Sequence, residues 1–428
     1  MTISQREFAQ QVVQQLSDAG YTALWAGGCV RDLLIGREPK DYDVATNARP
    51  EQVREVFGKR RTLSVGESFG VIVVLGPKSA GQVEVATFRT DGNYLDGRRP
   101  ETVVFSSPEE DAQRRDFTIN GMFYDPLKEE VMDFVGGQQD FAAGILRAIG
   151  DPHSRMEEDK LRMLRAVRFA ATFDFELDAA TADAVRSMAD QISVVSAERI
   201  AQELRRMLVD RHRHRAMQLC EDVNLLQMIL PELASVIADS DCWQKLQNSL
   251  DVLGEPDFPL VFALLLDSIL EQARLERRSG ESDHRLAEQV GRRLKLSNQE
   301  IDSATWLLKH RRHLDEAAGL PLSRLKRVLA HRLAPDLLGL MRARSVGWGF
   351  ELADVDFCEN YLQTTEREVL DPEPLISGDD LIKSGFRPGP QFKNVLDSVR
   401  DAQLELKIES PDEALELAAR MFEAGNSK

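Results

Sequence analysis

The hydrophobic pattern of the chain changes once, near residue 151, and this change limits the folds that the chain can adopt. Before it, the pattern predicts an amphipathic helix over residues 4–19 and short strands in the apolar runs at 70–75, 82–88 and 103–105. After it, strand signals fade and a helical periodicity rich in Leu, Ala, Arg and Glu continues to the end. The sequence therefore predicts an α/β head, built from a small mixed sheet with helices, followed by an all-helical remainder.

The length of the chain divides it further. A chain of 428 residues exceeds what one hydrophobic core usually supports, so several domains are expected. Clusters of proline and glycine in the helical part are candidate joints between helical modules. The predicted domains are a head over residues 1–150, a helical neck over 151–215, a helical body over 216–335 and a helical tail over 336–428.

The net charge of −17 argues against indiscriminate binding of nucleic acid, because attraction to phosphates supplies the sequence-independent part of such affinity. Any contact with RNA must then come from local basic segments, and arginines gather at residues 147–168 and 199–215. A solvated helical face explains these two segments equally well.

The amino-terminal segment and the cysteines bear on the compartment. The segment MTISQREFAQQVVQQLSDAG lacks a basic start followed by an apolar run, and no stretch of the sequence approaches the length needed to span a bilayer. The cysteines are far apart and form no CxxC pair, which suggests neither a disulfide framework nor a zinc site. We expect a cytoplasmic protein with no membrane partner, whose thiols are buried and reduced: Cys29, Cys220, Cys242 and Cys358.

The segment AGGCVRDLLIGREPKDYDVAT carries residues suited to phosphoryl transfer. Asp41 and Asp43 are one residue apart, so at the start of a strand they share a face and can hold a pair of metal ions. Mg²⁺ prefers carboxylate and phosphate oxygens, and two such ions stabilise both the attacking 3′-oxygen and the departing pyrophosphate. Gly27 and Gly28 permit close approach of the backbone to a triphosphate, and Arg31 follows them. A DxD alone is more often a surface turn, whereas the combination with GG and RD favours a nucleotide site.

A third carboxylate is expected on a neighbouring strand. In VEVATF, Glu84 alternates with Val83 and Val85, so its side chain lies on the opposite face from theirs. An edge strand with one solvated face explains Glu84 without any metal. Beside Asp41 and Asp43, we interpret Glu84 as a further metal ligand.

The segment EEDAQRRDFTINGMFYDP is the next polar cluster. Asp116 and Asn120 are four residues apart, which is one helical turn, and Arg114 and Arg115 precede them. Such a turn could present a carboxylate and an amide to a ribose while arginine binds phosphate. An N-capped surface helix fits the pattern about equally.

Together, GGCVRD, DYD and RRDFTIN resemble motifs of the class II tRNA nucleotidyltransferases and bacterial poly(A) polymerases, within the nucleotidyltransferase superfamily related to polymerase β. The resemblance implies that Asp41, Asp43 and Glu84 are catalytic. It also implies that Arg115, Asp116 and Asn120 recognise ribose and triphosphate. The stretch FRTDGNYLDGRRPETVVF is similar to the family's flexible loop, with Arg98 and Arg99 in place, which favours full CCA addition or A addition over CC addition.

The stretch MEEDKLRMLRAVRF resembles the family's EDxxR motif, which reads the incoming base, with Glu158, Asp159 and Arg162 at the matching positions. Asp159 and Arg162 are three apart on a predicted helix whose other face is apolar, so both polar heads can point into a cleft. The acceptors of Asp and the donors of Arg could pair with the edges of C and A, so the protein would serve as its own template. An Asp and Arg at this spacing are otherwise usually a surface ion pair. Arg165 and Arg168 on the same helix are also predicted to bind nucleotide.

The remaining motifs are interpreted as supporting elements. SAERIAQELRRML resembles the family's neck, with Arg199 and Glu203 positioning helices, and DPLKEEVMDFVGGQQD matches the segment that joins head and neck. LISGDDLIKSGFRPGPQFKNVL is similar to the tail that holds tRNA. VFALLLDSILEQ resembles an HD phosphohydrolase module only faintly, since Leu266 precedes Asp267 where a histidine ligand would be required. The residues predicted to be structural in the joining segment are Asp133, Gly136 and Gly137, and those available for tRNA phosphate in the tail are Arg387 and Lys393.

The sequence thus predicts an enzyme that uses two Mg²⁺ ions to transfer CMP and AMP from CTP and ATP to the 3′ end of tRNA. Two alternatives stay open within the class, namely an A-adding enzyme that works with a separate CC-adding enzyme and a poly(A) polymerase. A third, from another class, is an inactive RNA-binding protein on the same fold. The sequence does not decide between monomer and homodimer.

Overall fold

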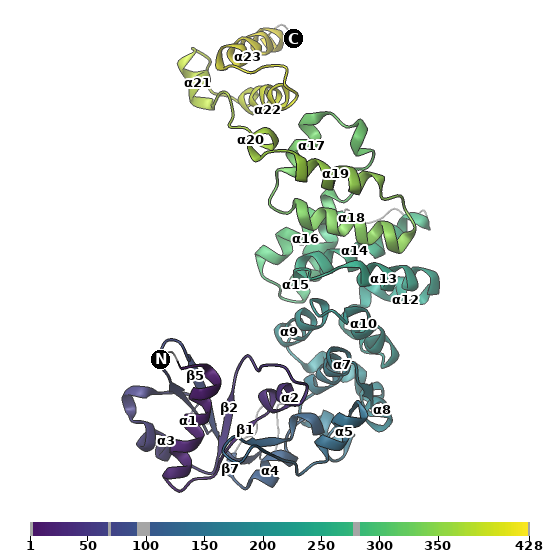
Figure 1. Ribbon diagram of the computed structural model, residues 1–428. Coiled ribbons are helices and arrows are strands. Elements are labelled where there is room, and N and C mark those ends of the chain that lie inside the picture. Colours follow the sequence, from purple (N-terminus) through teal and green to yellow (C-terminus); the bar gives the residue numbers. More distant parts are fainter. Residues whose placement is uncertain (1–2, 67–69, 92–102, 277–282, 427–428) are drawn as a thin grey trace. The chain divides into compact units, whose positions relative to one another are not determined.

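The computed structural model of the protein describes residues 3–66, 70–91, 103–276 and 283–426. The chain divides into two compact units, Met1–Pro231 and Glu232–Lys428. The first unit contains the mixed sheet, and the second is built from helices (Figure 1). The predicted α/β head and helical remainder are therefore confirmed, while the four predicted domains stay a prediction.

The head is organised around a mixed sheet with strand order β3-β4-β5-β2-β1-β8-β9. The neighbouring strands β2 and β5 are parallel, whereas the other neighbours in the sheet run antiparallel. Strands β6 and β7 form a separate antiparallel pair. The bounds are β1 Ala23–Ala26, β2 Asp43–Thr46, β3 Thr62–Gly66, β4 Val71–Leu75, β5 Gln82–Thr87, β6 Arg89–Asp91, β7 Val103–Phe105, β8 Phe123–Asp125 and β9 Glu130–Met132.

Helices cover one face of this sheet. Helix α1 (Gln5–Asp18), which the sequence predicts, begins at a capping box formed by Ser4 and Glu7, and its apolar stripe packs against the strands together with α3 (Pro50–Phe57) (Figure 1). This face carries the larger core, in which Phe8, Trp25, Val44, Ile72 and Val85 are buried. On the other face, Ala45 belongs to a smaller core with Phe88 and Phe123, and α4 (Pro108–Gln113) contributes Ala112 to it.

After the head, the first unit continues with helices, as predicted, except for one pair of short strands. Strands β10 (Ile145–Leu146) and β11 (Glu176–Leu177) form a short parallel pair, so the segment after residue 151 is not purely helical. Two residues per strand are too few to produce a visible alternation in the sequence. The helices are α5 Gly137–Ala143, α6 Pro152–Glu158, α7 Leu161–Phe173, α8 Ala179–Met188, α9 Ala197–Leu208, α10 Arg213–Asp222 and α11 Leu226–Ile229.

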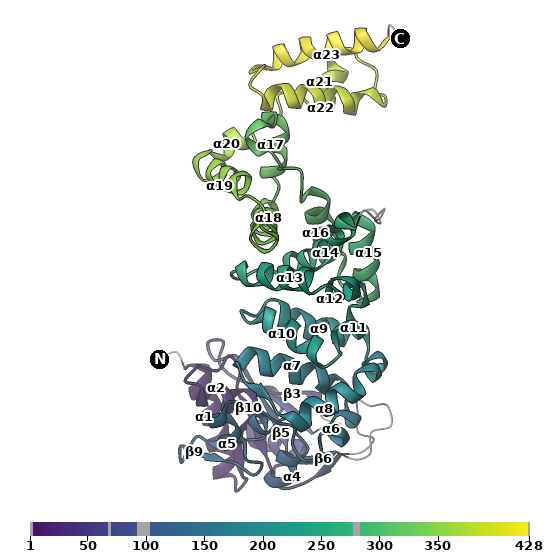
Figure 2. The same ribbon diagram turned by 90° about the vertical axis from the view of Figure 1, so that its right-hand side faces the viewer.

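The second unit is helical throughout its described part. Its last helices, α21 to α23, enclose a small core of their own around Leu381, Val395 and Ala414 (Figure 2). The helices are α12 Ala234–Ala238, α13 Ser240–Val252, α14 Phe258–Leu275, α15 Asp283–Arg293, α16 Asn298–His310, α17 Leu322–Leu329, α18 Ala334–Trp348, α19 Ala353–Thr364, α20 Arg367–Leu370, α21 Gly378–Lys383, α22 Gln391–Leu404 and α23 Pro411–Asn426.

Three further observations complete the fold. All four cysteines are buried and unpaired, as the sequence predicts. In the part of the chain that the structure describes, no helix has the length and apolar character needed to cross a membrane. Asp267 on α14 is completely buried, and its Oδ1 lies 2.8 Å from Nε of Arg311.

Candidate active site

The predicted catalytic carboxylates lie at one edge of strands β2 and β5. The parallel register places Asp43 directly opposite Glu84, and Asp41 lies just before β2. All three side chains are exposed, while Tyr42, between the two aspartates, is buried on the other side. The alternation expected from the sequence is therefore present, and it brings the three carboxylates to one face.

Asp43 is electrostatically strained in this arrangement. Its pKa is raised to about 6, first because surrounding protein removes water from the carboxylate and second because Glu84 carries the same charge. Arg115 opposes this shift, and Asp41 adds to it. As the side chains stand, no group of three or more metal-ligating residues converges on a common point among the residues that the structure describes. The donor set is nevertheless composed of carboxylate oxygens, which are the ligands that Mg²⁺ prefers.

The turn from β1 into α2 (Gly28–Leu34) brings backbone close to these carboxylates. Gly27 has φ +71° and ψ −126°, a conformation that favours glycine, and a Cβ there would lie 3.4 Å from Nη1 of Arg115. The glycine therefore allows a tight turn and leaves room for an arginine beside it.

A chain of hydrogen bonds runs from α2 to α7. Nη1 of Arg31 donates to Oδ1 of Asn120 (2.8 Å), Nδ2 of Asn120 donates to Oδ1 of Asp116 (3.0 Å), and Nε of Arg165 donates to Oδ2 of Asp116 (2.9 Å). Burial opposes ionisation of Asp116, but Arg165 and the hydrogen bond from Asn120 outweigh it, so the pKa of Asp116 is lowered to about 2. Asp116 is thus a permanently charged partner of Arg165. The expected helical turn is a 3₁₀ turn, Thr118–Asn120, because Phe117 is extended and ends any continuation of α4.

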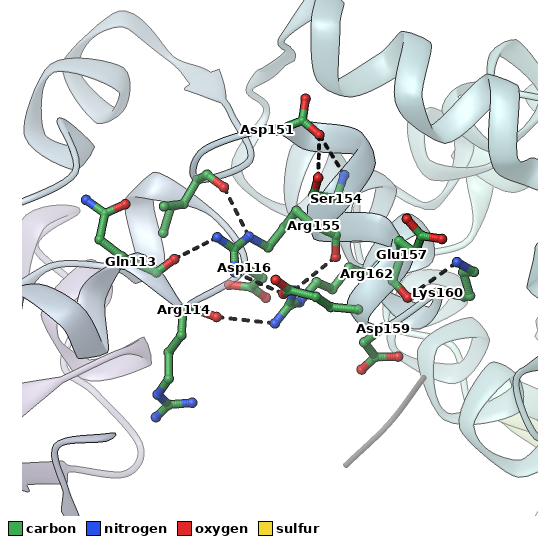
Figure 3. Close-up of polar contacts among 12 residues, drawn as sticks. Gln113, Arg114, Asp116, Asp151, Ser154, Arg155, Glu157, Asp159, Lys160 and Arg162 are labelled. Carbon is green, nitrogen blue, oxygen red and sulfur yellow. Dashed lines mark hydrogen bonds and ion pairs between the residues drawn. The ribbon is translucent and has the colours of Figure 1, made fainter. Parts of the chain in front are cut away.

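The residues predicted to read the base are brought together differently from the expectation. Asp159 is not on a helix with Arg162, since it has extended backbone (φ −147°, ψ 104°) between α6 and α7. Its carboxylate accepts hydrogen bonds from Arg199 of α9 at 2.7 and 3.2 Å. Arg162 donates to Glu158 and to the carbonyl oxygens of Arg155 (3.0 Å) and Arg114 (3.3 Å). In Figure 3 the Asp159 carboxylate lies apart from this cluster.

These groups surround one cavity of about 700 Å³, a volume suited to a nucleotide. Every residue predicted to bind nucleotide lines it, and Asp43 is at its wall, whereas Asp41 and Glu84 are not among the lining residues. Seven arginines line the cavity against three aspartates, so it is strongly positive in a protein of net charge −17. The lining residues are Gly27, Gly28, Arg31, Asp43, Arg114, Arg115, Asp116, Asn120, Asp159, Arg162, Arg165, Arg168, Phe169 and Arg206.

Comparison with known proteins identifies the family. Residues 23–147 match the model of the poly A polymerase head domain, and residues 174–237 match that of a probable RNA and SrmB-binding site of polymerase A. A CCA-adding enzyme of Lactobacillus helveticus is 32% identical over 410 residues, which are 95% of each chain. The chain belongs to the family of CCA-adding enzymes and bacterial poly(A) polymerases.

Other members of this family show different extents of similarity. Poly(A) polymerase I of Salmonella typhimurium is 38% identical over 246 residues, which are 55% of this chain and 52% of that protein. The crystal structure of the Bacillus stearothermophilus CCA-adding enzyme in complex with CTP has a TM-score of 0.78 at 27% identity and covers 99% of both chains. The Thermotoga maritima CCA-adding enzyme complexed with tRNA has the same fold, with a TM-score of 0.65 at 19% identity over 97% of this chain and 95% of that one.

Two lining residues of this family member were not singled out from the sequence. Phe169 reads as an apolar core position of α7, yet its ring lies 4.0 Å from the guanidinium carbon of Arg168 and 5.2 Å from that of Arg165. Arg206 reads as part of the neck helix, and its Nη1 donates to buried Glu203 (3.2 Å), which also accepts from Arg168 (2.5 Å). Glu203 of α9 is therefore bonded to two of the arginines that line the cavity.

The supporting motifs occupy their own positions. Asp133 accepts hydrogen bonds from the backbone N–H groups of Val135 (3.0 Å), Gly137 (3.0 Å) and Gln138 (2.8 Å), and a Cβ on Gly137 would lie 2.3 Å from the Thr118 carbonyl oxygen. Both observations fit a structural role. Arg387 and Lys393 are exposed in the second unit. Arg98 and Arg99 of the expected flexible loop lie outside the described residues.

Proposed function

We propose that this chain transfers CMP and AMP from CTP and ATP to the 3′ end of tRNA and so adds or repairs the CCA sequence. The observation that carries this proposal is the extent of similarity. The chain is related to CCA-adding enzymes over 95% of its length, whereas its similarity to poly(A) polymerase I spans only 55% of it. The positive cavity in the first unit supplies a site of suitable size and charge for a nucleoside triphosphate.

In this proposal Asp41, Asp43 and Glu84 hold two Mg²⁺ ions. When bound, the ions supply charge neutralisation for the attacking oxygen and the leaving pyrophosphate. The arginines of the cavity bind the triphosphate and orient its α-phosphorus toward the tRNA 3′-hydroxyl. The oxygen of that hydroxyl forms the new bond to phosphorus, the bond from the α-phosphorus to the bridging oxygen breaks, and the hydroxyl proton is released.

Two of the arginines that line the cavity are preorganised to bind the triphosphate. Asp116 holds Arg165, and Glu203 holds Arg168, each through a buried carboxylate within the first unit. Because these bonds form before any ligand enters, little reorganisation is needed when the triphosphate binds. Asp116 and Glu203 act in this scheme as positioning residues.

Base selection is assigned to Asp159 and Arg162, both of which line the cavity. Arg199 holds the carboxylate of Asp159 at the wall of the cavity, and Glu158 holds the guanidinium of Arg162 there. To read a base edge, each head must exchange part of these contacts for hydrogen bonds to C or A. A base that cannot offer matching donors and acceptors leaves buried polar groups unpaired and is rejected.

The four predicted regions take separate roles in the proposal. The head (1–150) performs the transfer, the neck (151–215) reads the base, the body (216–335) is a helical structural region, and the tail (336–428) contacts tRNA. The reaction is placed in the cytoplasm, where tRNA and nucleoside triphosphates meet.

The test is incorporation from CTP and from ATP, supplied separately, into tRNA that ends at the discriminator base, after one C and after two C. We expect CMP on the first two substrates and AMP on the third. AMP on the third alone would indicate an A-adding enzyme. AMP added repeatedly to unstructured RNA, without CMP on tRNA, would indicate a poly(A) polymerase and contradict the proposal.

A further inference from the structure

An unusual cluster of rings and cations lies in the second unit and contains none of the residues used above. It consists of Trp306 and His310 of α16, His313 after it, Arg324 of α17, and His331 and Arg332 before α18, together with Lys309; we call these residues the histidine patch. Three of the seven histidines of the chain meet here.

The rings of the patch are stacked. The indole of Trp306 lies 4.2 Å from the ring of His310 and 3.9 Å from that of His331, and both pairs are nearly parallel. The ring of His313 lies 4.7 Å from His310. Because the rings of His310 and His331 already stack on the indole of Trp306, the patch offers no open aromatic face to a base. It offers its positive charges and its ring nitrogens instead.

The charges around these rings are positive. Lys309, Arg324 and Arg332 are exposed, and within the described part of the chain none of the three forms an ion pair. Arg332 faces Asp336 of α18, which is half-buried, but no ion pair joins them. Three cations without an ion pair beside three histidines are unexpected in a protein of net charge −17, because like charges repel and a solvated face usually mixes signs.

The ring nitrogens differ in their ability to take a proton. Nδ1 of His331 accepts a hydrogen bond from the backbone N–H of Leu333 (3.2 Å), so protonation there would break that bond. Nδ1 of His310 lies 2.8 Å from the carbonyl oxygen of Trp306 and therefore carries a hydrogen, which leaves Nε2 to receive a second proton. His313 is half-buried and adjacent to His310. The proton-accepting members are thus His310 and His313.

We propose that the histidine patch binds the phosphate backbone of RNA, and that His310 and His313 take up a proton when it does so. The identity of the RNA as tRNA rests on the proposed function. Phosphates, rather than bases, are the recognised groups because the rings stack on one another and the free groups are cationic. The patch supplies a local positive surface that the overall charge of the chain does not.

Proton uptake follows from the environment of the histidines. In the free protein the pKa of His310 and of His313 lies below the ordinary 6.5, first because of burial. Lys309 adds to the shift of His310, and His310, Arg324 and Lys309 add to that of His313, while backbone hydrogen bonds at Trp306 and Lys309 oppose the two shifts. The pKa of His331 is lowered for the same reasons, with Arg332 and His310 as its charged neighbours. A phosphate at the patch would raise these pKa values. Affinity for RNA is therefore expected to increase as the pH falls through the raised value.

The first test compares two triple variants of the full chain that remove the same charge. Lys309→Gln, Arg324→Gln and Arg332→Gln remove the unpaired cations of the patch. The control, Arg274→Gln, Arg292→Gln and Arg367→Gln, removes exposed cations that each pair with a carboxylate. The patch variant should weaken tRNA binding about tenfold at moderate salt and reduce the slope of log K against log salt by about 2 to 3, while the control changes both much less.

The second test is the pH dependence of tRNA binding by the wild type and by the His310→Asn, His313→Asn variant. Wild-type affinity should increase severalfold between about pH 7.5 and about pH 5.5, and the variant should lose this increase. Melting curves would establish that the variant is folded. An identical pH dependence in both proteins would overturn the proton uptake.

Binding and activity separate this inference from the proposed function. In CMP incorporation the patch variant should raise KM for tRNA about tenfold and keep kcat. If the wild type incorporates no CMP or AMP, the proposed function fails, but the binding comparison still tests the patch. Unchanged affinity and salt slope in the patch variant, or capture of polyglutamate in preference to RNA, would overturn the RNA-binding assignment.

Discussion

Asp43 and Asp116 line the same cavity, yet their environments shift their pKa values in opposite directions. The pKa of Asp43 is raised to about 6, first because surrounding protein removes water from its carboxylate and second because of the charge of Glu84, whereas at buried Asp116 the charge of Arg165 and a hydrogen bond from Asn120 outweigh burial and lower the pKa to about 2. A carboxylate that meets other carboxylates is a place where a cation can bind. A carboxylate that meets arginine is part of the scaffold. The comparison therefore separates the residues proposed to take part in the reaction from those that position them.

The largest expected effect is on activity, from Asp43→Asn. Loss of one charge from the proposed metal-binding carboxylates should reduce CMP and AMP incorporation by at least about 10²-fold, since electrostatic stabilisation of the transition state is lost. Folding should be preserved, because the substitution removes a repulsion with Glu84. Incorporation assays and melting curves measure the two outcomes. Glu55→Gln, at an exposed carboxylate of α3, is the control, and equal activity in the two variants would remove the metal assignment.

Asp116→Asn should instead act mainly on stability. It leaves Arg165 without its anionic partner, and breaking a buried ion pair typically costs about 3 to 5 kcal/mol. Denaturant unfolding measures this cost. The control is Asp183→Asn, which breaks the exposed pair with Arg186 and should change stability by less than about 1 kcal/mol. If Asp116→Asn were as stable as the control, the positioning role would be wrong.

Asp159→Ala should act mainly on the choice of nucleotide. Loss of one hydrogen-bonding partner for the base should reduce discrimination between correct and incorrect triphosphates by about 1 to 3 kcal/mol, which is roughly 5- to 150-fold in the ratio of kcat/KM values. Competition between CTP and UTP on tRNA lacking its 3′ end measures this ratio. Glu157→Ala, at a neighbouring exposed carboxylate, should leave it unchanged. Unaltered selectivity in Asp159→Ala would refute its role in base reading.

The smallest effect, on stability against pH, tests the comparison directly. The folded pKa of Asp116 is below its ordinary 3.8, so its contribution is fully present above that value and is lost as the pH falls toward about 2. The shift corresponds to about 2 kcal/mol. The folded pKa of Asp43 is above its ordinary 3.8, so stability falls as the pH rises from there through about 6. The measurement is the free energy of unfolding against pH for the wild type, Asp43→Asn and Asp116→Asn. Each variant should lose the pH dependence that its substituted carboxylate contributes, and identical curves would contradict the assignment.

The sequence alone was sufficient for features that depend on local patterning. Alternation in DYD and VEV places Asp41, Asp43 and Glu84 opposite buried neighbours, because successive side chains of a strand point to opposite faces. The change near residue 151 from the two-residue period of strands to the longer period of helices likewise separates the head from the helical part. The residues predicted to bind nucleotide came from short motifs, and all of them line one cavity.

Features that depend on distant partners were decided by the tertiary structure. Asp159 was expected on a helix with Arg162, but contact with Arg199, forty residues further along the chain, accompanies an extended conformation between two helices. Phe169 has the pattern of a core residue and becomes part of the site only because α7 passes the arginine cluster.

What the amino-acid sequence determined by itself is the α/β character of the head, the helical character of most of the remainder, and the strand face that Asp41, Asp43 and Glu84 share, since these follow from the geometry of a single strand or helix. Only the tertiary structure decided the register that sets Asp43 opposite Glu84, the arginine partner that keeps Asp116 ionised and the stacking of rings on Trp306. These depend on contacts between segments far apart in the chain, and periodicity carries no information about which segments meet.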